Sequence, residues 1–430
     1  MNVDWAYDTP LRLPASAEFR QRAFLGDTSM IANALRAAGL LSKVGTSLAL
    51  VNVWYVPGRS LCAIYEGHVG PQPMLASVHF AQWPDAGVVP EAPSGTWIPA
   101  LGADVLLFPH DAGLPDLGRM IDFDDLPTLG VAPATSWRVL SYLPGARCTL
   151  AYADASQRMI AVGKMQKGAP ATHRQMQQLW LSPARDFSMA EPLAVDTAHG
   201  IRWERFVPGE RVDRIPDDAR RSAATEAAMQ ALAGLHGLPL DGLALRNAGV
   251  VFERAARKVA KRVRAVLPNL DASTAALCEE LGARLPALDR RPAVTLHGDF
   301  HTANILFDGQ TPGFIDLDEL ALGDPAYDLA LFASRLLLVG LVKPDRARQA
   351  AGLAQDLPVL YEKAGGQPVP GDVFAWYVAT LLLGRQVKTC IRHCAPRLDG
   401  LCATLLAWAH ATVRAGRVDA SLYSNGSTAA

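Results

Sequence analysis

The sequence predicts an α+β protein in which a β-rich first half is followed by a mostly helical second half. The N-terminal half contains two β-hairpins, each built from two β-prone runs around a Pro-Gly turn. From Pro216 onward, apolar residues recur at spacings of three and four, which is typical of amphipathic helices. Inside this helical half, residues 293–318 form a short run of β-prone segments and polar loops, where we expect the functional site.

Length, composition and charge limit the kinds of protein that this chain can be. The chain has 430 residues, enough for two or three domains, and 50% of them are hydrophobic, so it can bury a large core. The net charge of −1 gives no bulk electrostatic reason to expect a nucleic-acid partner. The first ten residues lack a signal-peptide pattern, and no uninterrupted apolar run reaches the roughly 18–20 residues of a membrane span. We therefore expect a cytoplasmic protein that does not bind a membrane and keeps its cysteines reduced.

Two local patterns have alternative interpretations. The sequence Cys390-Ile-Arg-His-Cys394 invites a metal-site interpretation, but it lacks a paired C-x-x-C. Together with Cys402, these cysteines fit helical spacing, so buried core thiols are favoured. The basic run at 254–264 has its apolar residues at helical spacing. It is interpreted as the solvated face of a surface helix, and the alternative is a rim that attracts phosphate.

The N-terminal region is expected to be helical over residues 1–45, with Ser16 capping one helix and Thr28 opening another. A Pro- and Gly-rich segment at 81–135 separates the two hairpins. It is interpreted as connecting structure with one short strand.

The two hairpins form an internal repeat. Both contain Tyr-x-Pro-Gly followed by a second tyrosine, and the leading tyrosines, Tyr55 and Tyr142, are 87 residues apart. Each hairpin is followed by a third β-prone run, at 74–80 and 159–165. Two small antiparallel sheets side by side are predicted, with coincidental turn chemistry as the alternative.

The segment 293–318 alternates short strands with polar loops. Strands are predicted at 293–296, 305–307 and 314–318, so Asp299, Asn304 and Asp316 fall on loops and strand ends. Phosphoryl transfer needs such groups: one carboxylate to orient a hydroxyl and accept its proton, and an amide and a carboxylate to hold magnesium against phosphates.

The spacing of these residues resembles a known superfamily. Asp299 and Asn304 match the D-x-x-x-x-N kinase loop, and Ile315-Asp316 and Gly323-Asp-Pro-Ala-Tyr-Asp328 follow at short distances. This combination resembles the aminoglycoside phosphotransferase and choline kinase superfamily, with a layout similar to maltokinase-like and glucosamine-kinase-like members. The resemblance implies a protein-kinase-like bilobal fold, with an antiparallel β-rich N-terminal lobe, a mostly helical C-terminal lobe and an N-terminal cap region.

The resemblance also implies roles in the second lobe. Asp299 is the expected catalytic base, and His297 is assigned to the catalytic set as a residue that ties the loop. Asn304 and Asp316 are expected to bind Mg²⁺. Asp318 is a second metal contact or, equally, a surface residue. Asp328 is expected to stabilise the catalytic loop.

In the first lobe, the resemblance implies that Lys164 contacts the phosphates of ATP, with Lys167 as an alternative. Glu204 and Phe206 belong to a strand that resembles the hinge between the lobes, where adenine binds. The predicted boundaries are 1–130 for a cap region with the hairpin repeat, 131–208 for the ATP-binding lobe and hinge, 209–420 for the helical lobe, and 421–430 for a disordered tail.

Two departures from the kinase pattern affect the predicted function. The sequence has no G-x-G-x-x-G loop, and the predicted helix at 172–181 contains no acid to pair with Lys164. Asp186 and Glu191 are downstream candidates, or phosphate alone holds the lysine. The predicted function is an ATP- and Mg²⁺-dependent kinase that phosphorylates a hydroxyl of a sugar, amino sugar or amino alcohol. The alternatives are a catalytically silent nucleotide-binding scaffold and a magnesium-dependent phosphohydrolase. The sequence does not indicate an oligomeric state.

Overall fold

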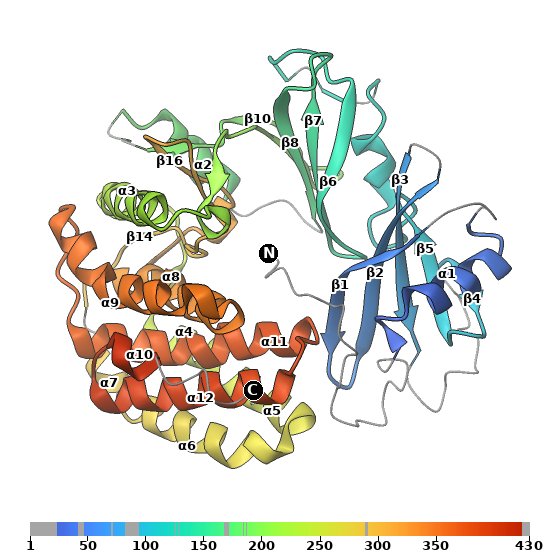
Figure 1. Cartoon of the computed structure of the whole chain (residues 1–430). Coiled ribbons are helices and arrows are strands. Elements are labelled where there is room, and N and C mark those ends of the chain that lie inside the picture. Colours follow the sequence, from blue (N-terminus) through green and yellow to red (C-terminus); the bar gives the residue numbers. More distant parts are fainter. Residues whose placement is uncertain are drawn as a thin grey trace.

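The computed structural model of the chain places two five-stranded antiparallel sheets beside a helical lobe (Figure 1). It describes residues 24–41, 47–69, 72–81, 94–124, 126–127, 129–166, 172–183, 185, 187–288 and 291–423. The fold is the predicted α+β arrangement. The expected helix after Ser16 and the alternative lysine, Lys167, lie outside the described residues.

The first sheet follows one short helix. Helix α1 (Thr28–Ala37) begins where predicted, because the Asp27 side chain accepts a hydrogen bond from the amide of Met30. The sheet has the order β1-β2-β3-β5-β4. Its strands are β1 (Ala49–Val56), β2 (Ser60–Val69), β3 (Gln72–Phe80), β4 (Thr96–Ile98) and β5 (Ala103–Leu107).

The second sheet contains the predicted ATP-binding strands, and its order is β6-β7-β8-β11-β10. Its strands are β6 (Ser136–Leu143), β7 (Arg147–Ala153), β8 (Met159–Gln166), β10 (Pro192–Asp196) and β11 (Ile201–Arg205). Helix α2 (His173–Leu181) lies between β8 and β10 in the chain. In each sheet, the first three strands form an antiparallel meander. A later hairpin completes the sheet, and the second strand of that hairpin pairs with the third strand of the meander. The two sheets therefore have the same topology.

The register confirms that the hairpins are equivalent. Tyr65 pairs with Ala76 in the first sheet, and Tyr152 pairs with Ala161 in the second. Three residues farther along the third strands stand His79 and Lys164 respectively. The expectation of one connecting strand at 81–135 was wrong, because both β4 and β5 fall there and complete the first sheet. The Pro- and Gly-rich composition concealed β4, which is only three residues long.

The helical lobe is built from long helices joined by short turns. Its helices are α3 (Asp218–His236), α4 (Ala248–Phe252), α5 (Lys258–Val266), α6 (Asp271–Gly282), α7 (Leu285–Leu288), α8 (Pro325–Val342), α9 (Ala347–Lys363), α10 (Gly371–Leu381), α11 (Lys388–Arg392) and α12 (Leu398–Ala415).

Two π-helical segments interrupt this lobe and touch each other. Glu253–Arg257 joins α4 to α5, and Leu382–Val387 joins α10 to α11. A Cβ atom on Gly384 would lie 2.2 Å from the Cβ atom of Ala255, so this close approach requires glycine. π-Helical turns widen the helix locally and often occur at functional sites.

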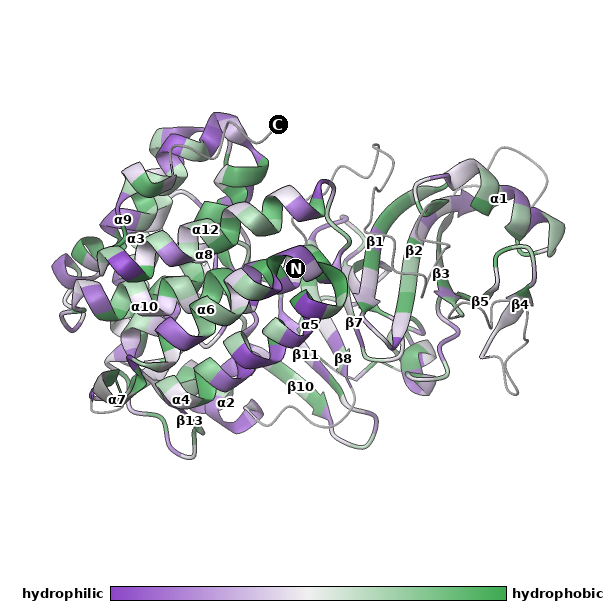
Figure 2. Ribbon diagram, turned by 90° about the horizontal axis from the view of Figure 1, so that it is seen from below, coloured by the Kyte–Doolittle hydropathy of each residue, from purple (hydrophilic) through white to green (hydrophobic). Residues whose placement is uncertain are grey.

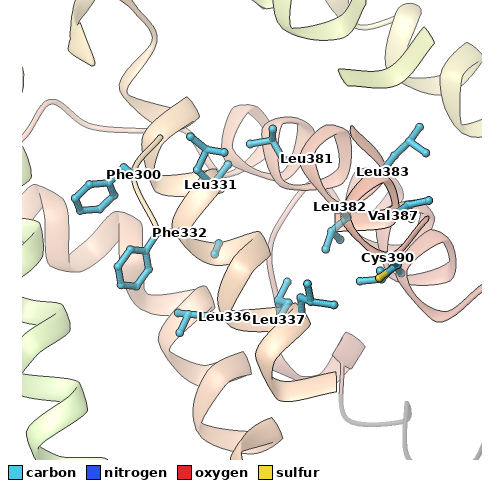
Figure 3. Close-up of a cluster of buried hydrophobic side chains, with 14 of the residues drawn as sticks. Phe300, Leu331, Phe332, Leu336, Leu337, Leu381, Leu382, Leu383, Val387 and Cys390 are labelled. Carbon is cyan, nitrogen blue, oxygen red and sulfur yellow. The ribbon is translucent and has the colours of Figure 1, made fainter. Parts of the chain in front are cut away.

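The hydrophobic core of the helical lobe packs against the segment 293–318. Phe300 and Phe332 pack with their ring centroids 5.4 Å apart, and Figure 3 shows α8 leucines filling the space between these rings and the segment Leu381–Cys390. Helix α8 is long and apolar enough to span a membrane by length and composition, although Asp328 and Arg335 interrupt its apolar run. However, 78% of it is buried inside the structure, which is typical of a core helix.

Two peripheral predictions have different outcomes. Cys390, Cys394 and Cys402 are buried thiols outside any disulfide, as predicted, and the described residues contain no group of three His, Cys, Asp or Glu side chains able to hold a metal. The predicted disordered tail begins too early. The Tyr423 side chain is buried and its hydroxyl lies 2.7 Å from that of Thr412, while 424–430 lie outside the described residues.

Candidate active site

The polar loop between β14 (Val294–Leu296) and β15 (Ile305–Phe307) forms the centre of the candidate site. Strand β15 pairs with β16 (Pro312–Phe314), so Asn304 and Ile315, which flank this hairpin, lie at the same end of it. Gly298 adopts a left-handed conformation with φ of +79°, and a Cβ atom there would lie 1.8 Å from the carbonyl oxygen of Glu319. Only glycine therefore fits the turn of the loop at this point.

A buried carboxylate on α8 fixes the start of the loop. The two oxygens of Asp328 accept hydrogen bonds from the backbone amides of His297 and Gly298, at 2.7 and 3.0 Å. His236 Nε2 lies 3.2 Å from Asp328, and its Nδ1 lies 2.7 Å from the hydroxyl of Tyr361. These contacts agree with the stabilising role expected for Asp328 and give His236 a structural position.

Asp299 lies in the loop with its carboxylate 5% exposed and in contact with an arginine from a distant helix. Its Oδ1 accepts a hydrogen bond from Nη2 of Arg385, and its Oδ2 lies 3.7 Å from Nε2 of His301. Burial alone would raise the pKa of Asp299, but the charges of Arg385 and His301 outweigh it and hold the pKa well below its usual range. Asp299 is thus ionised throughout the physiological pH range.

His301 and His297 both lie inside the protein. His301 is 4% exposed, and burial lowers its pKa more than Asp299 raises it. The ring of His297 packs edge-on against Phe300 and Phe314, and its Nδ1 accepts the amide hydrogen of Asp299 at 3.4 Å. This position ties the loop together and keeps the His297 ring away from the cleft described below.

Lys164 has an acidic partner that the sequence did not indicate. Its Nζ lies 3.0 Å from Glu204 on the adjacent strand β11 and 3.8 Å from Asp316 in the helical lobe. Burial alone would lower the pKa of Lys164, but Glu204, Asp318 and Asp316 together raise it. The ammonium group is therefore charged and links the two lobes.

Glu204 also binds Arg202, so its carboxylate faces the charged groups of the sheet. Arg202 Nε donates to Glu204 at 2.9 Å, and Arg202 Nη2 donates to Asp318. The candidates proposed from the sequence do not hold Lys164: Glu191 pairs with Arg205 at 2.5 Å, and Asp186 lies outside the described residues.

The predicted metal ligands come together at the hairpin of β15 and β16. The amide of Ile315 donates to the carbonyl of Asn304 at 3.1 Å, which places Asp316 next to Asn304. The side-chain NH₂ of Asn304 donates to the backbone of Asp299 at 2.9 Å, so its amide oxygen remains as the acceptor group. Asp316 has φ of +63°, a strained conformation for a residue with a side chain and one that clusters at functional sites.

These oxygen donors suit a hard divalent cation such as Mg²⁺. Asn304 and Asp316 supply an amide oxygen and a carboxylate, and Mg²⁺ is commonly held by one or two protein oxygens together with substrate phosphates. Asp318 is occupied by Arg202, which favours a structural role for it over a metal contact.

A cleft of about 690 Å³ connects these groups. Lys164, Glu204, Asn304, Asp316 and Asp318 all line it, and Phe206 lies on the connection between the lobes. Five arginines add positive charge to its wall: Arg138, Arg147, Arg205, Arg211 and Arg214. A cleft with this lining favours a polyanion such as a nucleotide phosphate chain.

Two residues of the site were missed by reasoning from sequence. Arg202 precedes Glu204 by two positions on a strand, and this spacing puts both side chains on one face of the sheet. The alternation of side chains along this strand could therefore have identified Arg202 from the sequence. Arg385 gave none, because it is 86 residues from Asp299 and stands within an apolar helix.

Comparisons with known proteins follow the same segment of the chain. Residues 163–366 match the family model of the phosphotransferase enzyme family, and this range includes Lys164, Asp299, Asn304 and Asp316. No curated protein matches the chain.

Several solved structures are similar at low identity. An aminoglycoside phosphotransferase from Streptomyces rimosus is 24% identical, with 56% of this chain and 90% of that chain covered and a TM-score of 0.42. A thermostable mutant of another aminoglycoside phosphotransferase, in complex with AMP-PNP and hygromycin B, is 18% identical, with coverages of 66% and 95% and a TM-score of 0.48. A choline/ethanolamine kinase family protein from Mesorhizobium loti is 15% identical, with coverages of 67% and 92% and a TM-score of 0.44.

The family match covers Lys164, Asp299, Asn304 and Asp316, which lie in or beside the candidate site. Residues 163–366 are therefore similar to the phosphotransferase enzyme family, which agrees with the superfamily predicted from the sequence.

Proposed function

We propose that the protein is a small-molecule kinase that transfers the γ-phosphate of ATP to a hydroxyl group. The acceptor class implied by the resemblance is a sugar, amino sugar or amino alcohol. The observation that carries the proposal is the single cleft shared by Lys164 and Glu204 from the sheet and by Asn304 and Asp316 from the helical lobe. The domain boundaries at 130 and 208 belong to the same proposal, because they separate the first sheet, the ATP-binding sheet and the helical lobe.

The nucleotide would occupy this cleft with its phosphates toward Lys164. Glu204 keeps the lysine charged and directs it toward the helical lobe. Asn304 and Asp316 would hold Mg²⁺, which would neutralise the negative charge that develops on the phosphates. Phe206 and its neighbours would meet the adenine at the connection between the lobes.

Asp299 would act on the acceptor hydroxyl. It accepts the proton as the bond between the hydroxyl oxygen and the γ-phosphorus forms and the bond to the leaving ADP oxygen breaks. The low pKa of Asp299 makes it a weak base. Positioning of the hydroxyl is therefore its main contribution, which suffices for a loose phosphoryl transition state.

The silent-scaffold alternative loses its main support in this arrangement. It depended on the missing acid partner of Lys164, and Glu204 fills that place.

The test is acceptor-dependent release of ADP from ATP, measured across a panel of hydroxyl compounds. Asp299→Asn is expected to lower turnover by at least about 10²-fold, the lower end for losing a positioned proton acceptor, and to leave ATP binding intact. Unchanged turnover in Asp299→Asn would contradict the proposal. ADP release without any acceptor would indicate a phosphohydrolase instead.

A further inference from the structure

The helical lobe gathers positive charge beside Asp299, on elements other than those that hold the predicted metal ligands. Arg385 contacts Asp299 directly and stands in the π-helical segment Leu382–Val387. Lys388 and Arg392 follow on α11 at a spacing of four, so they share one face of that helix. A run of cations thus extends from the catalytic carboxylate along α11.

A second helix adds another cation to this group. The contact of Gly384 with Ala255 brings the two π-helical segments together, and α5 continues from the one that contains Ala255. Most basic residues of α5 are exposed, in agreement with the solvated face predicted from the sequence, and Figure 2 shows this helix as largely hydrophilic. Arg262 is the exception, because it is half-buried and close enough to lower the pKa of Lys388.

Helices α5 and α11 are in contact, and the pKa shifts of their basic residues are those expected of neighbouring cations. Burial, together with Arg392, Arg262 and Arg385, lowers the pKa of Lys388 to about 8. Burial, Arg262, Arg385 and Arg147 lower the pKa of Arg392 to about 10. Arg147 begins strand β7 and lines the nucleotide cleft, so this cluster reaches the mouth of the cleft.

Few acidic side chains of the protein neutralise these cations. In the described part of the chain, no ion pair joins an acid to Arg147, Arg262, Lys388 or Arg392. Glu319 raises the pKa of Lys388, but its carboxylate is bound to Arg246 at 2.6 Å. The Arg392 guanidinium instead lies 4.2 Å over the ring of Trp54, and its Nε is buried without a hydrogen-bond partner.

We propose that Arg262, Lys388 and Arg392 bind an anionic group of the acceptor, so that the substrate is a hydroxyl compound bearing a phosphate or carboxylate. This inference rests on the proposed function and narrows its acceptor class, because a cationic amino sugar or amino alcohol would be repelled here. Arginine and lysine clusters are suited to phosphate and carboxylate groups. Trp54 also makes β1 of the first sheet a wall of this subsite, which gives the duplicated sheet a role.

The first test measures anion binding without requiring the acceptor. Sulfate is titrated into the full chain saturated with ADP and Mg²⁺, so that the nucleotide cleft is filled. We expect one sulfate site, weakened at least tenfold in Arg262→Gln and in Lys388→Gln. Lys261→Gln is the matched control, because Lys261 is the exposed neighbour of Arg262 on the same helix. No sulfate binding, or equal binding in all three variants, would overturn the inference.

The second test uses four hexoses that share a skeleton: glucose, glucosamine, glucuronate and glucose 6-phosphate. We expect any acceptor activity to be confined to the two anionic sugars, and Arg262→Gln to raise their KM while the KM for ATP stays unchanged. A preference for glucosamine or glucose would contradict the anionic subsite.

If no hexose is phosphorylated, the sulfate titration alone decides whether the anionic subsite exists. Failure of ADP and Mg²⁺ to bind would instead contradict the proposed function, and sulfate binding to Arg262→Gln and Lys261→Gln would then be compared without nucleotide.

Discussion

The contact between Arg385 and Asp299 should be visible as a pH-dependent contribution to stability. Asp299 is 5% exposed, and Arg385 is the strongest charge acting on it. In Arg385→Met, the buried carboxylate loses this partner and burial then raises its pKa. Removal of one member of a buried ion pair costs about 3–5 kcal/mol. Because the Arg385 side chain is 30% exposed, we expect about 2–4 kcal/mol at pH 7.5.

The sign of the pH dependence follows from the direction of each pKa. In the wild type, the depressed pKa of Asp299 makes the ionised carboxylate stabilising above its unfolded pKa of about 3.9. That contribution is constant between pH 7.5 and 5. In Arg385→Met, burial raises the pKa of Asp299 and makes its ionisation destabilising, and the penalty falls by about 1.4 kcal/mol for each pH unit below the raised pKa. The difference between the two proteins should therefore shrink as the pH is lowered.

The assay is urea unfolding of the wild type, Arg385→Met, Asp299→Asn and the double variant at pH 7.5 and 5.0. The double-mutant cycle isolates the pair from the other contacts of each residue. We expect a coupling energy of about 2–4 kcal/mol at pH 7.5 that decreases at pH 5.0. A coupling energy below about 0.5 kcal/mol would refute the reasoning, since exposed ion pairs give such values. A coupling energy that does not change with pH would refute it as well.

Three further changes test the supports of the site. Asp328→Ala leaves two buried amides without acceptors and should cost about 2–6 kcal/mol in urea unfolding, with a cost below 1 kcal/mol contradicting its role. Gly298→Ala should lower the melting temperature by several degrees, because its Cβ atom would meet the carbonyl of Glu319, and a wild-type melting temperature would rule out that clash. Glu204→Gln should weaken binding of a fluorescent ATP analogue about tenfold, because Lys164 loses its partner, and unchanged affinity would show that the pair does not position the lysine.

Local chemistry explains which parts of the fold could be predicted. The hairpin repeat was readable because the Tyr-x-Pro-Gly pattern specifies both a turn and a strand register, and Gly58 and Gly145 adopt the same left-handed conformation. Strand β4 could not be predicted, because its three residues show too little periodicity to stand out from a Pro- and Gly-rich segment. Its pairing with β5 is a tertiary event.

The site shows the same division. Asp299, Asn304 and Asp316 were found because one loop and one hairpin hold them at short sequence spacing. The partner of Lys164 could not be predicted from the kinase pattern, which places the acid on the helix after β8, whereas the carboxylate comes from the neighbouring strand β11. Arg385 depends on how α10 and α11 cross the loop, and that arrangement is fixed by packing around Gly384.

Magnesium-dependent nucleotide binding tests the central claim most directly, because it asks whether the cleft assembles Lys164, Asn304 and Asp316 around one ligand. Calorimetric titration of ATP into the wild type, Asp316→Asn and Asp299→Asn, with and without Mg²⁺, separates the proposed metal site from the proposed catalytic carboxylate. We predict that Mg²⁺ strengthens ATP binding to the wild type and to Asp299→Asn, and that Asp316→Asn loses this dependence. Equal Mg²⁺ dependence in all three proteins, or no ATP binding to the wild type, would contradict the account.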